Sequence, residues 1–232
     1  MILICLLKAE EYIVSIGATE LPVLVTYAFG IPVRRSYIFS PLPFINVPQS
    51  DIASTERTLH SLGSILCQGN NGSALILLIS GDRSSVGKST FSLFLMASLL
   101  QLGFSASSLA YIKPVTQCEA EQPISLYCKK NNIACQGIGP VVFYSGFTRA
   151  FLDDSTKSSA ELLLDVREAV AQISVGKRIV LVDGVGYPAV GSICGVSNAD
   201  VAAALNVPVL LVGKSGVGDA VDSFNLNARY VL

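Results

Sequence analysis

The sequence has 232 residues, enough for one large α/β domain with a sizeable core. Its 16 basic and 17 acidic side chains nearly cancel, and no Lys/Arg-rich run occurs, which argues against nucleic acid as a partner. Six cysteines without a CxxC pair, together with a single histidine, argue against a zinc site or a disulfide framework. We therefore expect reduced thiols and a cytoplasmic location, with an organellar one left open.

Residues 1–70 are unlike the rest of the sequence. The apolar run at 1–7 is too short to span a bilayer, and residues 12–33 are interrupted by an acid, prolines and a glycine. Glu10, Glu11 and Glu20 also argue against a transit peptide, and prolines at 41, 43 and 48 indicate a linker. We expect a poorly ordered extension that contributes no chemistry and does not bind membranes, followed by one domain over residues 71–232.

A strand, a glycine- and serine-rich turn and a helix follow one another over residues 74–103. Residues 74–80 are an unbroken apolar run, typical of a strand buried on both faces of a parallel sheet. In a phosphate-binding loop, glycines let backbone N–H groups approach the phosphates, a lysine reaches the β- and γ-phosphates, and the next hydroxyl binds Mg²⁺. Lys88 and Ser89 fit the last two roles. The predicted nucleotide-binding residues are Gly81, Arg83, Ser84, Ser85, Val86, Gly87, Lys88, Ser89 and Thr90.

The spacing of the glycines departs from the strict loop pattern. That pattern has four residues between its glycines, whereas five separate Gly81 from Gly87. The alternative interpretation is a plain serine-capped helix start, but the strand–turn–helix context favours nucleotide phosphate. A second Gly-Lys-Ser at residues 213–215 has no glycine-rich loop before it, so we interpret it as a strand-to-helix corner near the nucleotide.

Charged residues follow two later predicted strands. Lys113 lies near the end of a strand candidate over residues 105–115, and Asp183 follows a buried run over 178–182. The carboxyl ends of parallel strands border the crevice where open α/β sheets bind ligands. Lys113 can therefore face the ligand and Asp183 can bind the metal, whereas a solvated lysine and a turn-forming Asp-Gly are the alternatives.

Strands separated by helices predict the fold class: α/β, with a doubly wound, mostly parallel sheet and helices on both faces. The clearest helix covers residues 158–174. Ser158 and Glu161 form a capping-box pattern at its start, and apolar residues then repeat at helical spacing.

Taken in order, these landmarks resemble the dethiobiotin synthetase family and related P-loop amidoligase-type ATPases. The residues that carry the resemblance are the loop at 81–89, with the family's extra residue between its glycines, Lys113-Pro114-Val115, VLVDGVG at 180–186 and ADVAAALNVPVLLVG at 199–213. The resemblance implies a P-loop NTPase that uses ATP and Mg²⁺. It implies that a diamine takes up CO₂ as a carbamate, that the carbamate attacks the γ-phosphate, and that the second amine closes a ureido ring.

The same resemblance implies roles for single residues. Lys88 and Ser89 would bind the phosphates and Mg²⁺, and Lys113 would lie against the γ-phosphate and the carbamate. Asp183 would stand where the family has a metal-binding glutamate. The family's acidic Mg²⁺ ligand after the Lys-Pro-Val motif has Glu119 or Glu121 as approximate counterparts, and we take Glu121 as the third metal ligand. A homodimer is also implied.

Several departures from the family leave other functions open. Arg83 replaces a usual aspartate and stands where partitioning-type ATPases place a signature lysine, while Gln117 replaces a small hydroxylated residue. The sequence stops before the strand and loop that usually hold adenine, so we expect a domain truncated at its C-terminus. The alternatives are a nucleotide-binding regulatory module without ligase activity, a partitioning-type ATPase that dimerises over ATP through Arg83, and an inactive chain.

Overall fold

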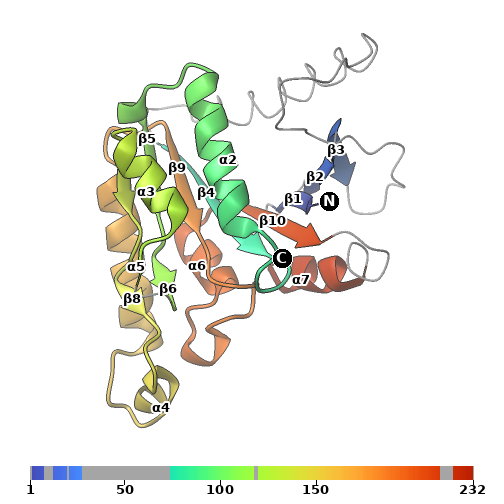
Figure 1. Ribbon diagram of the computed structural model, residues 1–232. Helices are drawn as coiled ribbons and strands as arrows, with labels where there is room; N and C mark the ends of the chain where they lie inside the picture. Colours follow the sequence, from blue (N-terminus) through green and yellow to red (C-terminus); the bar gives the residue numbers. More distant parts are fainter. Residues whose placement is uncertain are drawn as a thin grey trace.

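The computed structural model places its described strands in one sheet of eight, in the order β3-β2-β1-β10-β4-β9-β5-β7, beside a small two-stranded sheet. The structure describes residues 2–7, 13–19, 21–27, 74–117, 120–214 and 222–231. The last five strands of that order run parallel (Figure 1). They are β10 (Val209–Lys214), β4 (Leu75–Gly81), β9 (Ile179–Asp183), β5 (Leu109–Ile112) and β7 (Ala134–Gln136). The predicted fold class is confirmed.

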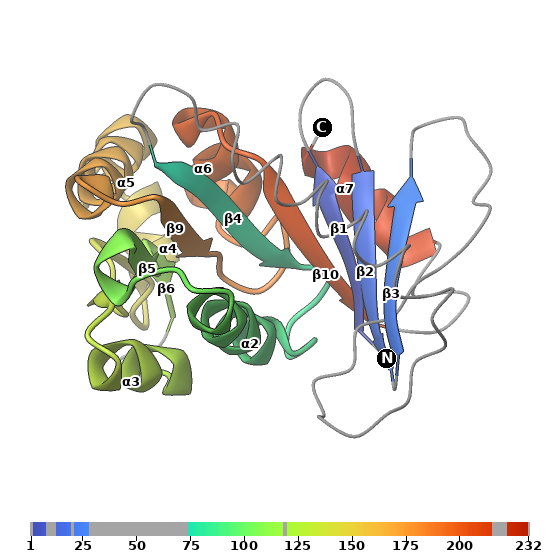
Figure 2. The same cartoon turned by 90° about the horizontal axis from the view of Figure 1, so that it is seen from above.

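Helices cover both faces of the parallel strands, as the view in Figure 2 shows. One face carries α2 (Lys88–Gln101) and α3 (Pro123–Lys130). The other carries α5 (Ser159–Ser174), α6 (Asn198–Leu205) and α7 (Phe224–Val231). The predicted capping box at the start of α5 is present, because the Ser158 hydroxyl accepts the Glu161 N–H and the Glu161 carboxylate accepts the Ser158 N–H.

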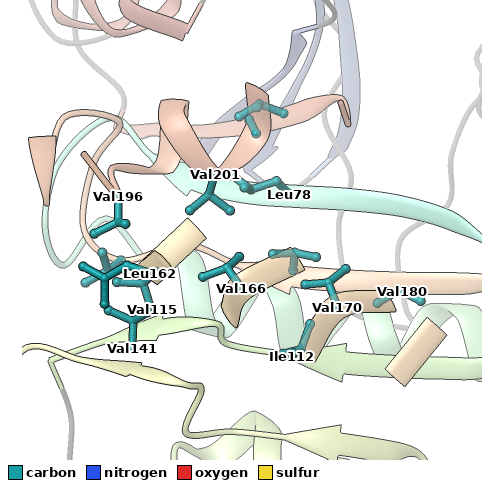
Figure 3. Packing of buried hydrophobic residues seen from close by; sticks show 14 of the residues in the cluster. Leu78, Ile112, Val115, Val141, Leu162, Val166, Val170, Val180, Val196 and Val201 are labelled. Atoms are coloured by element: carbon teal, nitrogen blue, oxygen red, sulfur yellow. The ribbon is translucent and has the colours of Figure 1, made fainter. Parts of the chain in front are cut away.

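The core has two parts because successive residues of a strand point to opposite faces. Leu78 of β4 packs with Val166 of α5 and Val201 of α6 on one face (Figure 3). Its neighbour Ile79 packs with Met96 of α2 on the other face. Every residue of β9 and of β5 is buried, and apart from Asp183 at the end of β9 no charged residue interrupts these strands, so they do not alternate between apolar and polar.

Short elements gather beyond the carboxyl ends of β5 and β9. β6 (Val115–Thr116) pairs in parallel with β8 (Val141–Val142), and α4 (Phe147–Leu152) contacts the 3₁₀ turn η2 (Ser192–Cys194). A further 3₁₀ turn, η1 (Ala106–Ser108), leads into β5. β6, β8, α4 and η2 border the carboxyl strand ends at which the sequence predicts ligand binding, whereas η1 lies at the amino end of β5.

The structure differs from the prediction over residues 2–27. Three antiparallel strands lie there, β1 (Ile2–Leu7), β2 (Ile13–Thr19) and β3 (Leu21–Tyr27). β1 pairs with β10 from Ile2 opposite Lys214 to Leu7 opposite Val209, so these strands extend the main sheet. Sequence analysis did not predict these strands, and the expectation of a poorly ordered or loosely docked extension over residues 1–70 stays a prediction. The boundary at residue 70 stays a prediction, and the predicted linker lies outside the described residues.

Two further predictions concern the chain ends and membranes. The corner predicted at 213–219 is described as far as Lys214, the last residue of β10, and the rest lies outside the described residues. Within the described ranges, no helix combines the length and the apolar character needed to cross a bilayer.

Candidate functional site

The loop between β4 and α2 is held at its start by two backbone hydrogen bonds and ends at a glycine with positive φ. The Gly81 N–H donates to the Gly186 carbonyl at 3.1 Å, and the Asp82 N–H donates to the Val212 carbonyl at 2.8 Å. A Cβ on Gly81 would lie 2.7 Å from the Arg83 carbonyl oxygen, so the close approach of the backbone there requires glycine. Gly87 closes the loop at φ 97°, in the left-handed region, immediately before Lys88 begins α2.

The predicted nucleotide-binding residues of this turn differ in their exposure to solvent. Ser84, Ser85 and Thr90 are exposed. Arg83, Val86, Gly87 and Ser89 are partly buried, while Gly81 and Lys88 are buried. The Arg83 side chain lies 3.5 Å from Asp82 of the same loop. The exposed serines leave the outer side of the turn open to solvent, as access to a nucleotide requires.

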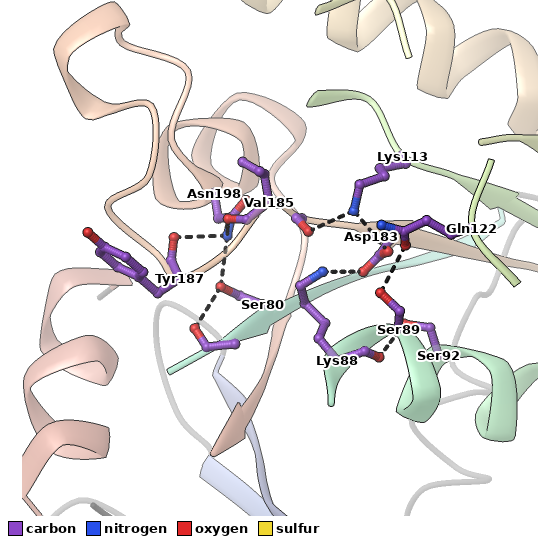
Figure 4. A network of polar contacts seen from close by, with 12 residues as sticks. Ser80, Lys88, Ser89, Ser92, Lys113, Gln122, Asp183, Val185, Tyr187 and Asn198 are labelled. Carbon is purple, nitrogen blue, oxygen red and sulfur yellow. Dashed lines mark hydrogen bonds and ion pairs between the residues drawn. The ribbon is translucent and has the colours of Figure 1, made fainter. Parts of the chain in front are cut away.

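Lys88 points inward rather than into solvent. Its side chain is 9 % exposed, and Nζ donates to Asp183 Oδ1 at 2.9 Å (Figure 4). Burial lowers the pKa of Lys88 and nearby Lys113 lowers it further, although the charge of Asp183 raises it, so that the pKa lies below 10.5. The phosphate-loop lysine is therefore held at the strand ends by a carboxylate from the neighbouring strand.

Asp183 is the point at which the predicted residues meet. It is fully buried at the end of β9, and its Oδ2 accepts from Lys113 Nζ at 3.2 Å and from the Tyr111 hydroxyl at 2.8 Å. Burial raises the pKa of Asp183, but the charges of Lys88 and Lys113 and the hydrogen bonds from Lys88 and Tyr111 together outweigh burial and hold the pKa below 3.8. The structure thus brings Lys88, Lys113 and Asp183 together, as the strand-end argument predicts.

This arrangement leaves positive charge in excess. Lys88 and Lys113 are both buried and share one carboxylate among the described side chains. Burying an ammonium group without full compensation is unfavourable. An anion bound at the loop would supply the missing negative charge. The loop leads into the N-terminus of α2, where free backbone N–H groups of a helix favour an anion.

The predicted metal ligands are only partly brought together. The Ser89 hydroxyl donates to Gln122 Oε1 at 2.9 Å. Glu121 instead forms an ion pair with Lys129 at the surface, and Glu119 lies outside the described residues. In the described ranges, no group of three or more His, Cys, Asp or Glu side chains could hold a metal ion. Ser89, Gln122 and Asp183 offer the oxygen ligands that Mg²⁺ prefers, so the residues present fit this ion. The assignment of Glu121 as a metal ligand stays a prediction.

Asn198 holds the backbone that follows Asp183. Its side chain is buried; Nδ2 donates to Ser80 Oγ at 2.9 Å and to the Val185 carbonyl at 2.9 Å, and Oδ1 accepts the Val185 N–H at 2.9 Å. A Cβ on Gly184 would lie 2.5 Å from Asn198 Oδ1, so the close contact needs glycine. Asn198 thereby ties the start of α6 to the ends of both β4 and β9.

A cavity of about 260 Å³ lies beyond these strand ends, between α4 and η2. Among the described residues, its lining is aromatic and uncharged, with Gln117, Phe143, Tyr144, Phe147, Val190 and Cys194 as members. Val190 connects it to the loop: a Cβ built on Gly186 would lie 2.9 Å from Val190 Cγ2 and 3.5 Å from Ser84 Oγ. Gly186 therefore lies between Ser84 of the phosphate loop and Val190 of the cavity lining.

Tyr111, Gln122 and Asn198 were missed by the sequence reasoning. Tyr111 stands two residues before Lys113, and side chains at that spacing in a strand share a face, so this signal was available. Gln122 precedes Pro123 at the first turn of α3, which marks it as an N-cap but does not indicate its contact with Ser89. Asn198 follows Ser197, the N-cap residue of α6, and the sequence around it does not indicate its contacts with Ser80 and Val185.

Comparison with known proteins gives one match. The model of a family described as AAA domain, AAA_26, matches residues 76–231. No curated protein and no solved structure matches the chain.

Proposed function

Because the chain belongs to the AAA_26 family of P-loop ATPases, which includes the dethiobiotin synthetase-like ATPases, we propose that it is an ATP- and Mg²⁺-dependent ligase of the dethiobiotin synthetase type. Its acceptor is a diamine that carries CO₂ as a carbamate. ATP phosphorylates the carbamate, and the second amine displaces phosphate to close a ureido ring.

The observation that carries this proposal is the convergence of Lys88 and Lys113 on Asp183 beside the loop. Phosphoryl transfer asks the protein mainly to position its reactants and to neutralise charge. Lys88 lies on the loop side of Asp183, where it can exchange the carboxylate for the β- and γ-phosphate oxygens. Lys113 comes from the next strand, so its ammonium can neutralise a carbamate that approaches the γ-phosphate from that side.

The remaining residues have supporting roles. Bound Mg²⁺ would neutralise charge on the phosphates, and Ser89, Gln122 and Asp183 are the oxygen ligands available to it. Tyr111 and Lys113 keep Asp183 oriented when Lys88 turns to the nucleotide, because both contact Oδ2 while Lys88 contacts Oδ1. The cavity beside Gly186 is placed to hold the apolar body of the acceptor.

Calorimetry followed by a phosphate-release assay tests the proposal. We expect ATP to bind in the presence of Mg²⁺, and we expect phosphate release only when bicarbonate and a diamine are both supplied. Lys88→Ala should abolish nucleotide binding, whereas Lys113→Ala should retain binding and lose substrate-stimulated release. The surface variant Lys157→Ala is the matched control and should behave as the wild type. Failure of the wild-type chain to bind either ATP or ADP would refute the proposal.

A regulatory nucleotide-binding module is the second candidate, and the composition of the metal corner favours it. Among the described side chains there, Asp183 is the carboxylate, and it is already engaged by Lys88 and Lys113. Such a site can bind nucleotide without turning it over. The same assay separates the two functions, because the module predicts ATP binding without any phosphate release that bicarbonate and diamines stimulate.

A further inference from the structure

The Ser89 hydroxyl, which the loop pattern assigns to the metal, is hydrogen-bonded to an amide oxygen. Gln122 Oε1 accepts this hydrogen bond at 2.9 Å, and the two side chains come from α2 and from the residue before α3. Figure 4 shows Ser89, Gln122 and Asp183 directed into the same corner, next to Lys88. Glu121, one residue earlier, points away to Lys129 at the surface.

We propose that Gln122 is the third protein oxygen of the magnesium corner and that its neutral charge makes nucleotide binding weakly dependent on Mg²⁺. This inference rests on the proposed nucleotide site. Mg²⁺ binds through oxygen ligands, and the affinity of such sites follows the number of charged ligands. A corner with an amide in place of a second carboxylate therefore attracts the ion less strongly.

The charges around Asp183 support the same conclusion. Lys88 and Lys113 lie 2.9 and 3.2 Å from the oxygens of Asp183 and offset its negative charge. The corner is therefore not anionic before nucleotide arrives, and the phosphates must supply most of the attraction for the ion. Glutamate at position 122 would add a negative charge next to the Ser89 hydroxyl.

The position of Gln122 makes it suitable for substitution. It is the N-cap residue of α3, yet its side chain makes no cap hydrogen bond, so its replacement removes no side-chain cap from this helix. A negative charge at this helix N-terminus interacts favourably with the helix dipole. Gln122→Glu should therefore fold as the wild type does, and Gln122→Met preserves side-chain volume while removing the oxygen.

The experiment measures the dissociation constant of ATP by calorimetry with and without Mg²⁺, on the full chain. We divide the dissociation constant measured without Mg²⁺ by the one measured with Mg²⁺. Gln122→Glu should increase this ratio by about tenfold, and Gln122→Met should bring it toward one. Gln101→Glu makes the same change of charge at the other end of α2, roughly 18 Å away at 1.5 Å per residue, and should leave the ratio unchanged.

Two further arms keep the outcome decisive. Glu121→Gln tests the competing ligand. The proposal would be overturned if Glu121→Gln lost the dependence of ATP binding on Mg²⁺ while Gln122→Met kept it. Mn²⁺ alone, followed by electron paramagnetic resonance, should bind Gln122→Glu more tightly than the wild type. This arm needs no nucleotide, so failure to bind ATP would refute the proposed function, whereas a Gln122→Glu variant that matches the wild type in both measurements would refute the role of Gln122.

Discussion

Replacement of Asp183 by asparagine should both destabilise the protein and change its response to phosphate. Asp183 is fully buried and compensates the ammonium groups of Lys88 and Lys113, at 2.9 and 3.2 Å. Removal of one partner of a buried ion pair typically lowers the free energy of unfolding by about 3–5 kcal/mol, because the other partner keeps its charge without compensation. The asparagine oxygen can still accept one hydrogen bond, so we expect a loss of about 3 kcal/mol, at the lower end of that range.

Thermal unfolding by circular dichroism measures this loss. For a chain of this size, about 3 kcal/mol corresponds to a decrease of roughly 6–12 °C in the midpoint. Asp165→Asn is the matched control, because Asp165 pairs with Lys157 at the surface, where exposed ion pairs contribute little. That variant should unfold near the wild-type midpoint.

Addition of ATP or tripolyphosphate without metal provides the second part of the test. Ligands that bind the folded state raise its stability in proportion to the logarithm of their concentration over the dissociation constant. Phosphate should recover more stability in Asp183→Asn than in the wild type, because it supplies the negative charge that the substitution removed. Equal midpoints for Asp183→Asn and Asp165→Asn, or no recovery with polyphosphate, would refute the assignment of an anion site at this carboxylate.

Three other predictions follow, two from the contacts of Asp183 and one from the Cys128–Cys135 pair. Tyr111→Phe removes the hydrogen bond to Asp183 Oδ2 and should lower the free energy of unfolding by about 1.5–3 kcal/mol in urea titrations; an unchanged urea midpoint would contradict it. The pKa of Asp183 lies below its ordinary 3.8, so the ionised carboxylate stabilises the fold above that pH, and calorimetric scans should show stability falling as the pH drops below 3.8, less steeply in Asp183→Asn. A hydrogen bond from Cys128 lowers the pKa of Cys135 to about 7, so the rate of Cys135 alkylation, followed by peptide mass spectrometry, should be half-maximal near pH 7, whereas a midpoint above pH 8 would contradict this.

The core of the fold could be predicted because its signals are local. The apolar runs that became β4 and β9 lie in the interior of the parallel sheet, where both faces are buried and the sequence needs no alternation. The capping box at Ser158 was equally visible, since its two partners stand three residues apart.

The convergence of Lys88, Lys113 and Asp183 was predictable from topology. All three follow parallel strands, whose carboxyl ends share one edge of the sheet. Gln122 was not predictable in the same way. It reaches Ser89 because α3 packs against α2, and no spacing along the sequence indicates that contact.

The first three strands were missed because their stabilising partner is distant in the sequence. β1 pairs with β10, about two hundred positions further along, and no window of sequence near residues 2–7 contains that information. β2 and β3 then depend on β1, since each pairs with the strand before it. Short apolar runs of this kind acquire a conformation from the edge that they join.

The junction between β1 and β10 has a consequence for any attempt to shorten the protein. β10 is hydrogen-bonded to β4 on one side and to β1 on the other, along six residue pairs. A chain begun at residue 71 would expose a row of unpaired amides and carbonyls along β10, a strand of mostly apolar residues, and such exposed edges associate with other copies. Aggregation of that shortened chain would therefore indicate that β10 has lost its pairing with β1, and it would not show that the core is unstable.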